Sequence, residues 1–287
     1  MRPLPERPLV RKPATLLPSI IFLNYPDHFG RLIRPRREGI PSAMNLKGRT
    51  GVVTGGVRGI GAAAARALRD AGATVLVTAR RPGSAEELAL DVSDPKSVDA
   101  FAREARRRLG HVDILVNNAG IASSAPIKRI AFEDWNHIIA VNLTGTMLCT
   151  QAFIAEMAER GWGRVVNMAS IAARTGAPYV AAYTASKHGV LGFTRVAASE
   201  YASKGVTVNA VCPGYVDTDM TTESVKRVME KTGLPETEAL QAILRTANQP
   251  RLISPEEVAF AVVSLCANEA SGLNGQALIV DAGGLLS

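Results

Sequence analysis

The stretch that decides the fold is VVTGGVRGIGAAAARALRDAG, residues 52–72. A β-branched run ends at Thr54, glycines follow at positions 55, 56, 59 and 61, and an alanine-rich segment closes at Gly72. Glycines allow a tight turn and the close approach of a phosphate, and a helix that begins after them offers free N–H groups and a positive dipole end. The stretch therefore predicts a strand, a phosphate-binding loop and a helix, as in dinucleotide sites.

The glycine spacing by itself is only a weak indication. Gly55-x-x-x-Gly59-x-Gly61 differs from the usual GxGxxG pattern. A simple tight turn is the alternative interpretation. We favour a dinucleotide site because the strand before the glycines and the helix after them are the context that such a loop requires.

Outward from this stretch, short apolar runs alternate with longer helical segments through residues 44–287. Alternating strands and helices predict a parallel sheet with helices on both faces, and apolar runs without strict alternation suit strands buried on both sides. We therefore expect one α/β domain without a second core. The runs are TGVVTG (50–55), ATVLVTA (73–79), VDILVNN (112–118), GRVVNMAS (163–170), GVTVNAVC (205–212), QALIVD (276–281) and the weaker LALDV (88–92).

Residues 1–43 differ in composition from the rest of the chain. They hold eight of the 16 prolines and eight Arg or Lys against three acidic residues, whereas the remaining chain has 25 basic and 23 acidic residues. We interpret them as a disordered N-terminal extension, or as sequence upstream of a natural start at Met44; a targeting or anion-binding arm is the alternative. The domain itself shows no charge excess that indicates nucleic-acid binding, and the stretch ATLLPSIIFL is too short to span a membrane.

Cysteine and histidine usage limits the classes of protein. The three cysteines, at positions 149, 212 and 266, have no paired spacing, and no secretory signal is apparent. We therefore expect reduced thiols in a cytoplasmic protein. The four histidines are scattered singly, so the sequence predicts no metal site.

The end of the second apolar run indicates which dinucleotide binds. An acidic residue about 20 positions past the glycines holds the ribose 2′-hydroxyl of NAD, whereas arginine receives the 2′-phosphate of NADP. This chain has Ala79 followed by Arg80 and Arg81, and Arg58 lies within the glycine loop. We predict NADP(H) as the cofactor; NAD(H) is the alternative if these arginines are only solvated loop charges.

Tyr183 and Lys187 stand four positions apart in a segment that we predict to be a helix, so both side chains project from one face. A phenol with its ordinary pKa of about 10 is a poor base at neutral pH, and a nearby ammonium favours the phenolate. We expect Lys187, together with an oxidised nicotinamide, to lower the pKa of Tyr183 so that it exchanges a proton with an alcohol oxygen. Ser170 would hydrogen-bond that oxygen. Asn142 would hold a backbone carbonyl and a water near Lys187.

These motifs occur in the order and at the spacing of a known family. With TGGVRGIG at 54–61, NNAG at 117–120, YTASK at 183–187 and PG at 213–214, the chain resembles the classical short-chain dehydrogenases/reductases over roughly residues 45–284. The resemblance is closest to 3-oxoacyl and polyketide ketoreductases. It implies a Rossmann-type, doubly wound sheet of seven parallel strands, and hydride transfer at a carbonyl or secondary alcohol.

The same resemblance implies a role for each matched position. Asn142, Ser170, Tyr183 and Lys187 would hold the water, orient the oxygen, move the proton, and bind the ribose while tuning the tyrosine. The chain departs from the family by a short stretch between residues 80 and 91, where a longer helix is common. Besides Tyr183 and Lys187, the implied cofactor-binding residues are Gly55, Val57, Arg58, Gly59, Ile60, Gly61, Arg80, Arg81, Asp91, Val92, Asn117, Ala119, Gly120, Pro213, Gly214, Val216 and Thr218.

For the reaction, we predict reduction of a ketone, such as a 3-oxoacyl thioester, to a secondary alcohol with Tyr183 as proton donor. The alternatives are an NAD-dependent secondary-alcohol dehydrogenase of the hydroxyacyl-CoA or hydroxysteroid type and, least favoured, a non-catalytic dinucleotide-sensing binder. Residues 218–250 are expected to form a lid, and Tyr179 to line the pocket. Of two arginines that carrier-dependent relatives often present, Arg129 matches the first but Ser199 occupies the second. Docking to an acyl-carrier protein is therefore not favoured over a CoA thioester or a free ketone.

Two segments rich in small residues, near 133–160 and 183–203, have apolar positions on more than one face. Such helices can pack against the sheet and against a second subunit, and the resembling family commonly pairs them. We expect a homotetramer or homodimer, with a small carbonyl or alcohol compound as the other partner.

Overall fold

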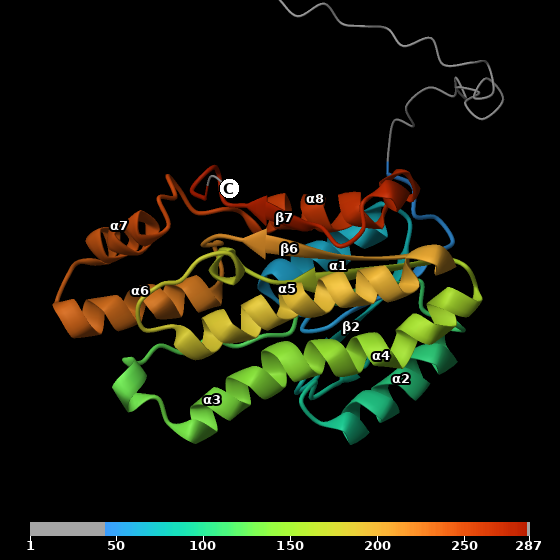
Figure 1. Ribbon diagram of the computed structural model, residues 1–287, viewed down its shortest axis with the longest axis horizontal. Coiled ribbons are helices and arrows are strands. Elements are labelled where there is room, and N and C mark those ends of the chain that lie inside the picture. The colour runs from blue at the N-terminus through green and yellow to red at the C-terminus, as the bar shows by residue number, and fades with distance from the viewer. Residues whose placement is uncertain (1–43, 286–287) are drawn as a thin grey trace, which may run out of the picture. The chain divides into compact units, whose positions relative to one another are not determined.

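Seven parallel strands form the central sheet, in the order β3-β2-β1-β4-β5-β6-β7. Figure 1 shows β6 beside β7, which is the last strand of this order. The computed structural model describes residues 44–285, so the extension predicted for residues 1–43 lies outside the described residues. The predicted α/β fold with a doubly wound, seven-stranded sheet is confirmed. The strands are β1 (Thr50–Val53), β2 (Thr74–Ala79), β3 (Leu88–Ala89), β4 (Ile114–Asn117), β5 (Gly163–Met168), β6 (Val206–Pro213) and β7 (Ala277–Val280).

The strand order reverses direction beside β1, which pairs with β2 on one side and with β4 on the other. In open α/β sheets, ligands bind at the carboxyl ends of the strands where the order reverses. The weak run at residues 88–92 forms only the two-residue edge strand β3, whose sole neighbour is β2. The topology thus places the glycine loop after β1 and the NNAG motif after β4 at one crevice.

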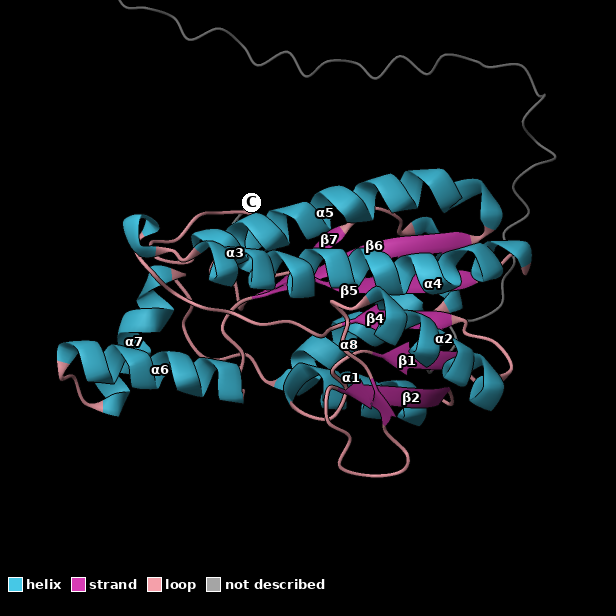
Figure 2. Cartoon of the chain, turned by 90° about the horizontal axis from the view of Figure 1, so that it is seen from below, coloured by secondary structure: helices cyan, strands magenta, loops and turns pink. Residues whose placement is uncertain are grey.

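Helices cover both faces of the sheet (Figure 2). On one face α1 packs against α8, and on the other α4 packs against α2 and α5. The prediction of a helix around Tyr183 and Lys187 is confirmed, because α5 contains both. The helices are α1 (Gly59–Asp70), α2 (Pro95–Leu109), α3 (Phe132–Ile139), α4 (Gly145–Glu159), α5 (Ala181–Tyr201), α6 (Asp219–Thr232), α7 (Glu236–Thr246) and α8 (Pro255–Cys266).

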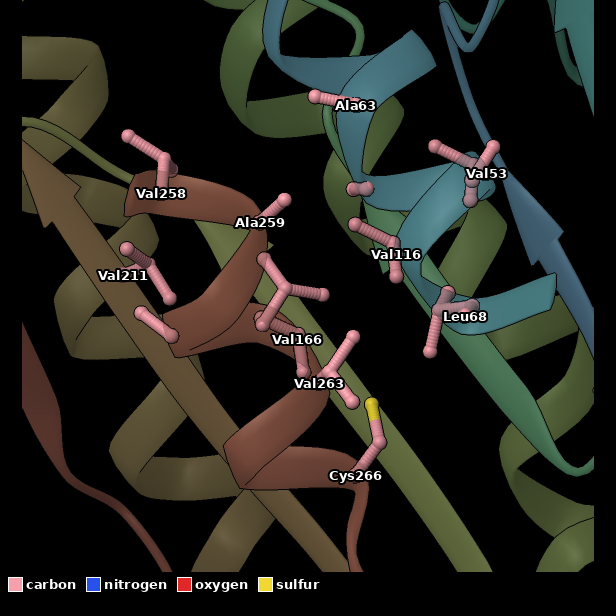
Figure 3. Close-up of a cluster of buried hydrophobic side chains, with 14 of the residues drawn as sticks. Val53, Ala63, Leu68, Val116, Val166, Val211, Val258, Ala259, Val263 and Cys266 are labelled. Atoms are coloured by element: carbon pink, nitrogen blue, oxygen red, sulfur yellow. The ribbon is translucent and has the colours of Figure 1, made fainter. Parts of the chain in front are cut away.

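The core between α1, α8 and the sheet explains the alanine-rich sequence of α1. Ala63, Ala64 and Ala65 are almost fully buried, so small side chains let this helix approach its neighbours closely. Leu68 and Val53 lie in the same cluster, as Figure 3 shows. Full burial of a leucine stabilises the fold by about 1.5–3 kcal/mol.

Residues 218–248, here called the α6–α7 segment, carry a small core of their own. Val225, Ala239 and Ile243 are buried there, and Tyr215 packs against them. The segment leaves and rejoins the domain at one place, where Val216 and Ile253 form an isolated parallel bridge.

The helical run Phe132–Glu159 is long and apolar enough to cross a membrane by length and composition alone, with a mean hydropathy of 1.6 over its best window. Half of that window is buried inside the domain, against α2, α5 and the sheet. These contacts are those of a core helix. A π-helical turn, Ala140–Thr144, joins α3 to α4 within this run.

Candidate functional site

The glycine loop between β1 and α1 forms a cradle with no room for side chains. Gly55 and Gly59 have φ angles of 61° and 52°, in the left-handed region that glycine adopts readily. A Cβ at Gly61 would lie 2.3 Å from the Gly55 carbonyl oxygen and 2.5 Å from Asn118 Nδ2. No side chain caps the first turn of α1 and no acidic residue lies in it, so its N–H groups and dipole remain available to an anion.

Asn118, which the sequence analysis did not single out, ties this loop to the end of β4. Its Nδ2 donates hydrogen bonds of 3.0 Å to the carbonyls of Thr54 and Gly55. The backbone N–H groups of Asn118 and Ala119 both donate to Thr54 Oγ1. These four bonds hold the glycine loop against the carboxyl end of β4.

Asn117 points the opposite way, because successive side chains of a strand alternate between faces. It is 3 % exposed, and its Nδ2 donates to Thr150 Oγ1 and Asn167 Oδ1 in the core. Its Oδ1 has no partner among the described residues. The side chain next to the glycine loop is therefore that of Asn118, while Asn117 stays a predicted cofactor-binding residue.

The residues predicted at the adenosine end lie on the exposed rim of β2 and β3. Arg80 and Arg81 are exposed. The hydrogen bond from Ser93 lowers the pKa of Asp91, and the positive charge of Arg80 lowers it further. Val92 is buried, Val57 is exposed, and Ile60 packs partly against the core.

Arg58 extends from the glycine loop to the start of α6. Its Nη1 lies 3.2 Å from Asp219 Oδ2, with the two side chains 75 % and 69 % exposed. Exposed ion pairs contribute about 0–1 kcal/mol. A phosphate can therefore replace Asp219 as the partner of Arg58.

Asn142 lies in the π-helical turn and holds the backbone that follows β4. Its Oδ1 accepts the N–H of Ile121 at 2.9 Å, and its Nδ2 donates to the Ile121 carbonyl at 2.9 Å and to Ser186 Oγ at 3.0 Å. Asn142 thus holds a backbone carbonyl as predicted, but protein groups use both of its amide hydrogens. Thr146 Oγ1 also donates to its main-chain carbonyl, whose second lone pair remains available to the expected water.

Lys187 lies close to the other predicted catalytic residues. It is 4 % exposed, its Nζ donates to the Met168 carbonyl at 2.7 Å, and Nζ lies 5.7 Å from the centroid of the Tyr183 ring. A Cβ at Gly120 would lie 3.6 Å from this Nζ. Ser170, at the carboxyl end of β5, accepts the N–H of Ala172 through Oγ, which leaves its hydroxyl hydrogen free to donate.

Burial sets the titration of both groups. It lowers the pKa of Lys187 to about 8 and raises the pKa of Tyr183, although the Ser170 side chain opposes the rise. Tyr183 is half-buried. Desolvation of the phenolate is the largest effect on the pKa of Tyr183, and it acts against the lowering that we predict from Lys187 together with an oxidised nicotinamide.

The turn after β6 carries one unused backbone donor. The N–H groups of Gly214, Tyr215 and Asp217 donate to Val280 O, Gln249 Oε1 and Ile253 O, respectively. Within residues 44–285 no acceptor faces the N–H of Val216, a residue that is 3 % exposed. Pro213 is buried at the end of β6, and Thr218 lies beside the glycine loop, since a Cβ at Gly59 would be 3.2 Å from Thr218 Cγ2.

Comparison with known proteins places this geometry in a family. The family model for short chain dehydrogenases matches residues 49–228. The chain belongs to the short chain dehydrogenase family. It is 38% identical over 251 residues to a 3-oxoacyl-(acyl-carrier-protein) reductase, FabG, of Vibrio harveyi, covering 84% of this chain and 98% of that protein.

Two further members of the short chain dehydrogenase family show its range. A D-beta-hydroxybutyrate dehydrogenase of Cupriavidus necator is 34% identical over 253 residues, covering 83% of this chain and 98% of that protein. A solved structure of a variant actinorhodin polyketide ketoreductase with NADPH superposes with a TM-score of 0.76 at 36% identity, covering 82% of this chain and 96% of that chain. The resemblance seen in the sequence motifs is confirmed.

This short chain dehydrogenase has a small open pocket between α3 and the start of α5. Tyr179, which we predict to line the substrate pocket, borders this small pocket with its ring 62 % exposed and a left-handed φ of 72°. Its carbonyl accepts the N–H of Ala125, which fixes the loop on the other side. The lining residues are Ser123, Ala125, Ile130, Asp134, Trp135, Tyr179, Ala181 and Ala182.

The residues of this family member fit a nicotinamide dinucleotide. The glycine cradle and the uncapped helix α1 suit a pyrophosphate, and the unpaired N–H of Val216 suits a carboxamide oxygen. Among residues 44–285 no three His, Cys, Asp or Glu side chains gather as metal ligands would.

Proposed function

We propose that this enzyme reduces a ketone, in a 3-oxoacyl thioester or a similar compound, to a secondary alcohol with NADPH. The observation that carries the proposal is the grouping of Tyr183, Lys187 and Ser170 beside the glycine cradle, at the carboxyl ends of the strands. The names of the reductase and ketoreductase relatives support this direction and this cofactor.

Each residue has a separate task in the proposed reaction. NADPH, when bound, supplies the hydride. The raised pKa of Tyr183 keeps its phenol protonated at neutral pH, as a proton donor to the developing alkoxide requires. The free hydroxyl hydrogen of Ser170 donates to the same oxygen. Lys187, held by Met168, has two further N–H groups for the ribose hydroxyls.

The substrate and the cofactor are tested together. We expect the purified enzyme to oxidise NADPH, followed by absorbance, with acetoacetyl-CoA or with a cyclic or steroid ketone, and to use NADH poorly. Arg58, Arg80 and Arg81 would bind the 2′-phosphate, so Arg80→Glu should lower kcat/KM for NADPH about 10- to 100-fold. Activity with NADH should change little.

Arg103→Glu makes the same charge change on the exposed surface of α2 and serves as the control. It should leave cofactor preference unaltered. Equal or better use of NADH by the unaltered enzyme would reject the NADP assignment, and inactivity with every ketone would reject the reduction.

The pH dependence follows from Lys187. Its pKa of about 8 means that the ammonium is mostly present at pH 7 and is lost as the pH rises through 8. If the ammonium is needed, kcat/KM for reduction should be level below about pH 8 and fall tenfold per unit above it, since kcat/KM reports the free enzyme. Initial rates between pH 6 and 10 measure this, and a level profile up to pH 10 would contradict it.

The assembly and the lid are also proposals. Apolar side chains stay exposed on α5, α8 and β7 (Val196, Phe260 and Leu278), which supports a homotetramer or homodimer that light scattering would detect. The α6–α7 segment has its own small core and leaves and rejoins the domain at one place, which supports its role as a lid over the site. We also propose that the enzyme is cytoplasmic.

A further inference from the structure

Gln249 is a buried amide in the loop between α7 and α8. It is 4 % exposed, although glutamine is normally a surface residue. The end of α7 determines where it lies. Asn248 has a left-handed φ of 49°, its N–H bonds to the Arg245 carbonyl, and the N–H of Gln249 bonds to the Leu244 carbonyl. This pair of bonds is a Schellman motif with asparagine at the left-handed position, and it directs Gln249 back into the domain.

The Gln249 side chain pairs with both backbone groups of Tyr215. Oε1 accepts the Tyr215 N–H and Nε2 donates to the Tyr215 carbonyl, each at 2.8 Å, and Nε2 also donates to the Arg251 carbonyl. The amide thus adds one more pairing to the bridge between Val216 and Ile253. Its bonds join the chain entering the α6–α7 segment to the chain leaving it.

Gly214 makes this approach possible. A Cβ at position 214 would lie 2.1 Å from Gln249 Oε1, a distance that no side chain tolerates. Any side chain at position 214 would therefore displace the Gln249 amide from this place. Val280 holds Gly214 and Gln249 holds Tyr215, and the unpaired N–H of Val216 follows these two residues in the turn.

We propose that Gln249 is a positioning residue for hydride transfer: its buried amide fixes the turn 214–216, and with it the Val216 N–H that orients the nicotinamide. The inference rests on the proposed function, because it needs a nicotinamide at this turn. Loss of the amide leaves the Tyr215 N–H without an acceptor, and the turn shifts to find one. Displacement of a reacting group by about 1 Å can lower a rate about 100-fold.

Gln249→Met, which keeps the length but removes all three bonds, tests the proposal. We expect kcat/KM for NADPH to fall roughly 10- to 100-fold, and the isotope effect with nicotinamide-deuterated NADPH to rise, because hydride transfer becomes slower. The affinity for 2′,5′-ADP, which lacks the nicotinamide, should stay within about twofold of the unaltered enzyme, as calorimetry would measure.

Two controls separate positioning from general stability. Gln241→Met makes the same substitution on the exposed face of α7 and should change neither rate nor affinity. Ile243→Ala removes part of the small core of the α6–α7 segment. It should lower the melting temperature without the rise in the isotope effect.

The outcomes are distinct. Wild-type rates in Gln249→Met, or an equal loss of 2′,5′-ADP affinity, would overturn the inference. Failure of the unaltered enzyme to bind NADPH or 2′,5′-ADP would instead overturn the proposed function. If Gln249→Met does not fold, Gln249→Glu decides by the same measurements, because it keeps the acceptor for Tyr215 but sets a carboxylate against two carbonyls.

Discussion

Tyr183→Phe is expected to lower kcat for ketone reduction about 100- to 10,000-fold, the range typical for loss of a general acid. The affinity for NADPH should hardly change, because the ring keeps its place near Lys187 and only the hydroxyl is removed. Stopped-flow or steady-state rates measure the first effect, and quenching of protein fluorescence by NADPH measures the second.

Tyr179→Phe is the matched control for this substitution. It removes the same hydroxyl from an exposed ring that borders the small pocket between α3 and α5. We expect a change in KM for bulky ketones at most. Substantial turnover by Tyr183→Phe, or an equal loss in Tyr179→Phe, would reject Tyr183 as the proton donor.

Gly61→Ala is expected to abolish NADPH binding, with an increase in Kd of about 100-fold or more. The new methyl group would collide with the Gly55 carbonyl and the Asn118 amide, and neither is the free end of a flexible side chain. The loop must therefore open away from β4. Overpacking of this kind also costs about 1–3 kcal/mol of stability, so calorimetric titration and thermal unfolding should both respond.

Gly272→Ala provides the comparison. A Cβ at Gly272 meets no atom within 4 Å, and its φ is not left-handed. This variant should bind NADPH normally. Normal binding by Gly61→Ala would mean that the glycine loop is not the pyrophosphate site.

Local patterns in the sequence were sufficient to predict the sheet, the glycine loop and the helix that carries Tyr183 and Lys187. Strand runs and helix spacing are properties of neighbouring residues, so they can be recognised without knowledge of the tertiary contacts. Even the weak run at residues 88–92 was placed correctly, although only two of its residues pair at the sheet edge.

The parts that the sequence did not predict depend on contacts between distant segments. Gln249 lies in no recognisable sequence motif. Its role appears only in the structure, where it bonds to Tyr215, 34 residues earlier in the chain. Asn118 was overlooked because the NNAG motif does not say which asparagine faces the loop. The effect of desolvation on the pKa of Tyr183 was not predicted, because spacing along a helix reports proximity to Lys187 but not the depth of burial.

The α6–α7 segment leaves and rejoins the domain at the same place, and this has an evolutionary consequence. A stretch that starts and finishes at the same point, and that contains its own apolar centre, can be lengthened, shortened or exchanged while the hydrogen bonds of the sheet stay intact. Relatives could therefore acquire new substrates by changes in the α6–α7 segment alone. In this chain Gln249 lies where the variable α6–α7 segment joins the constant part of the domain.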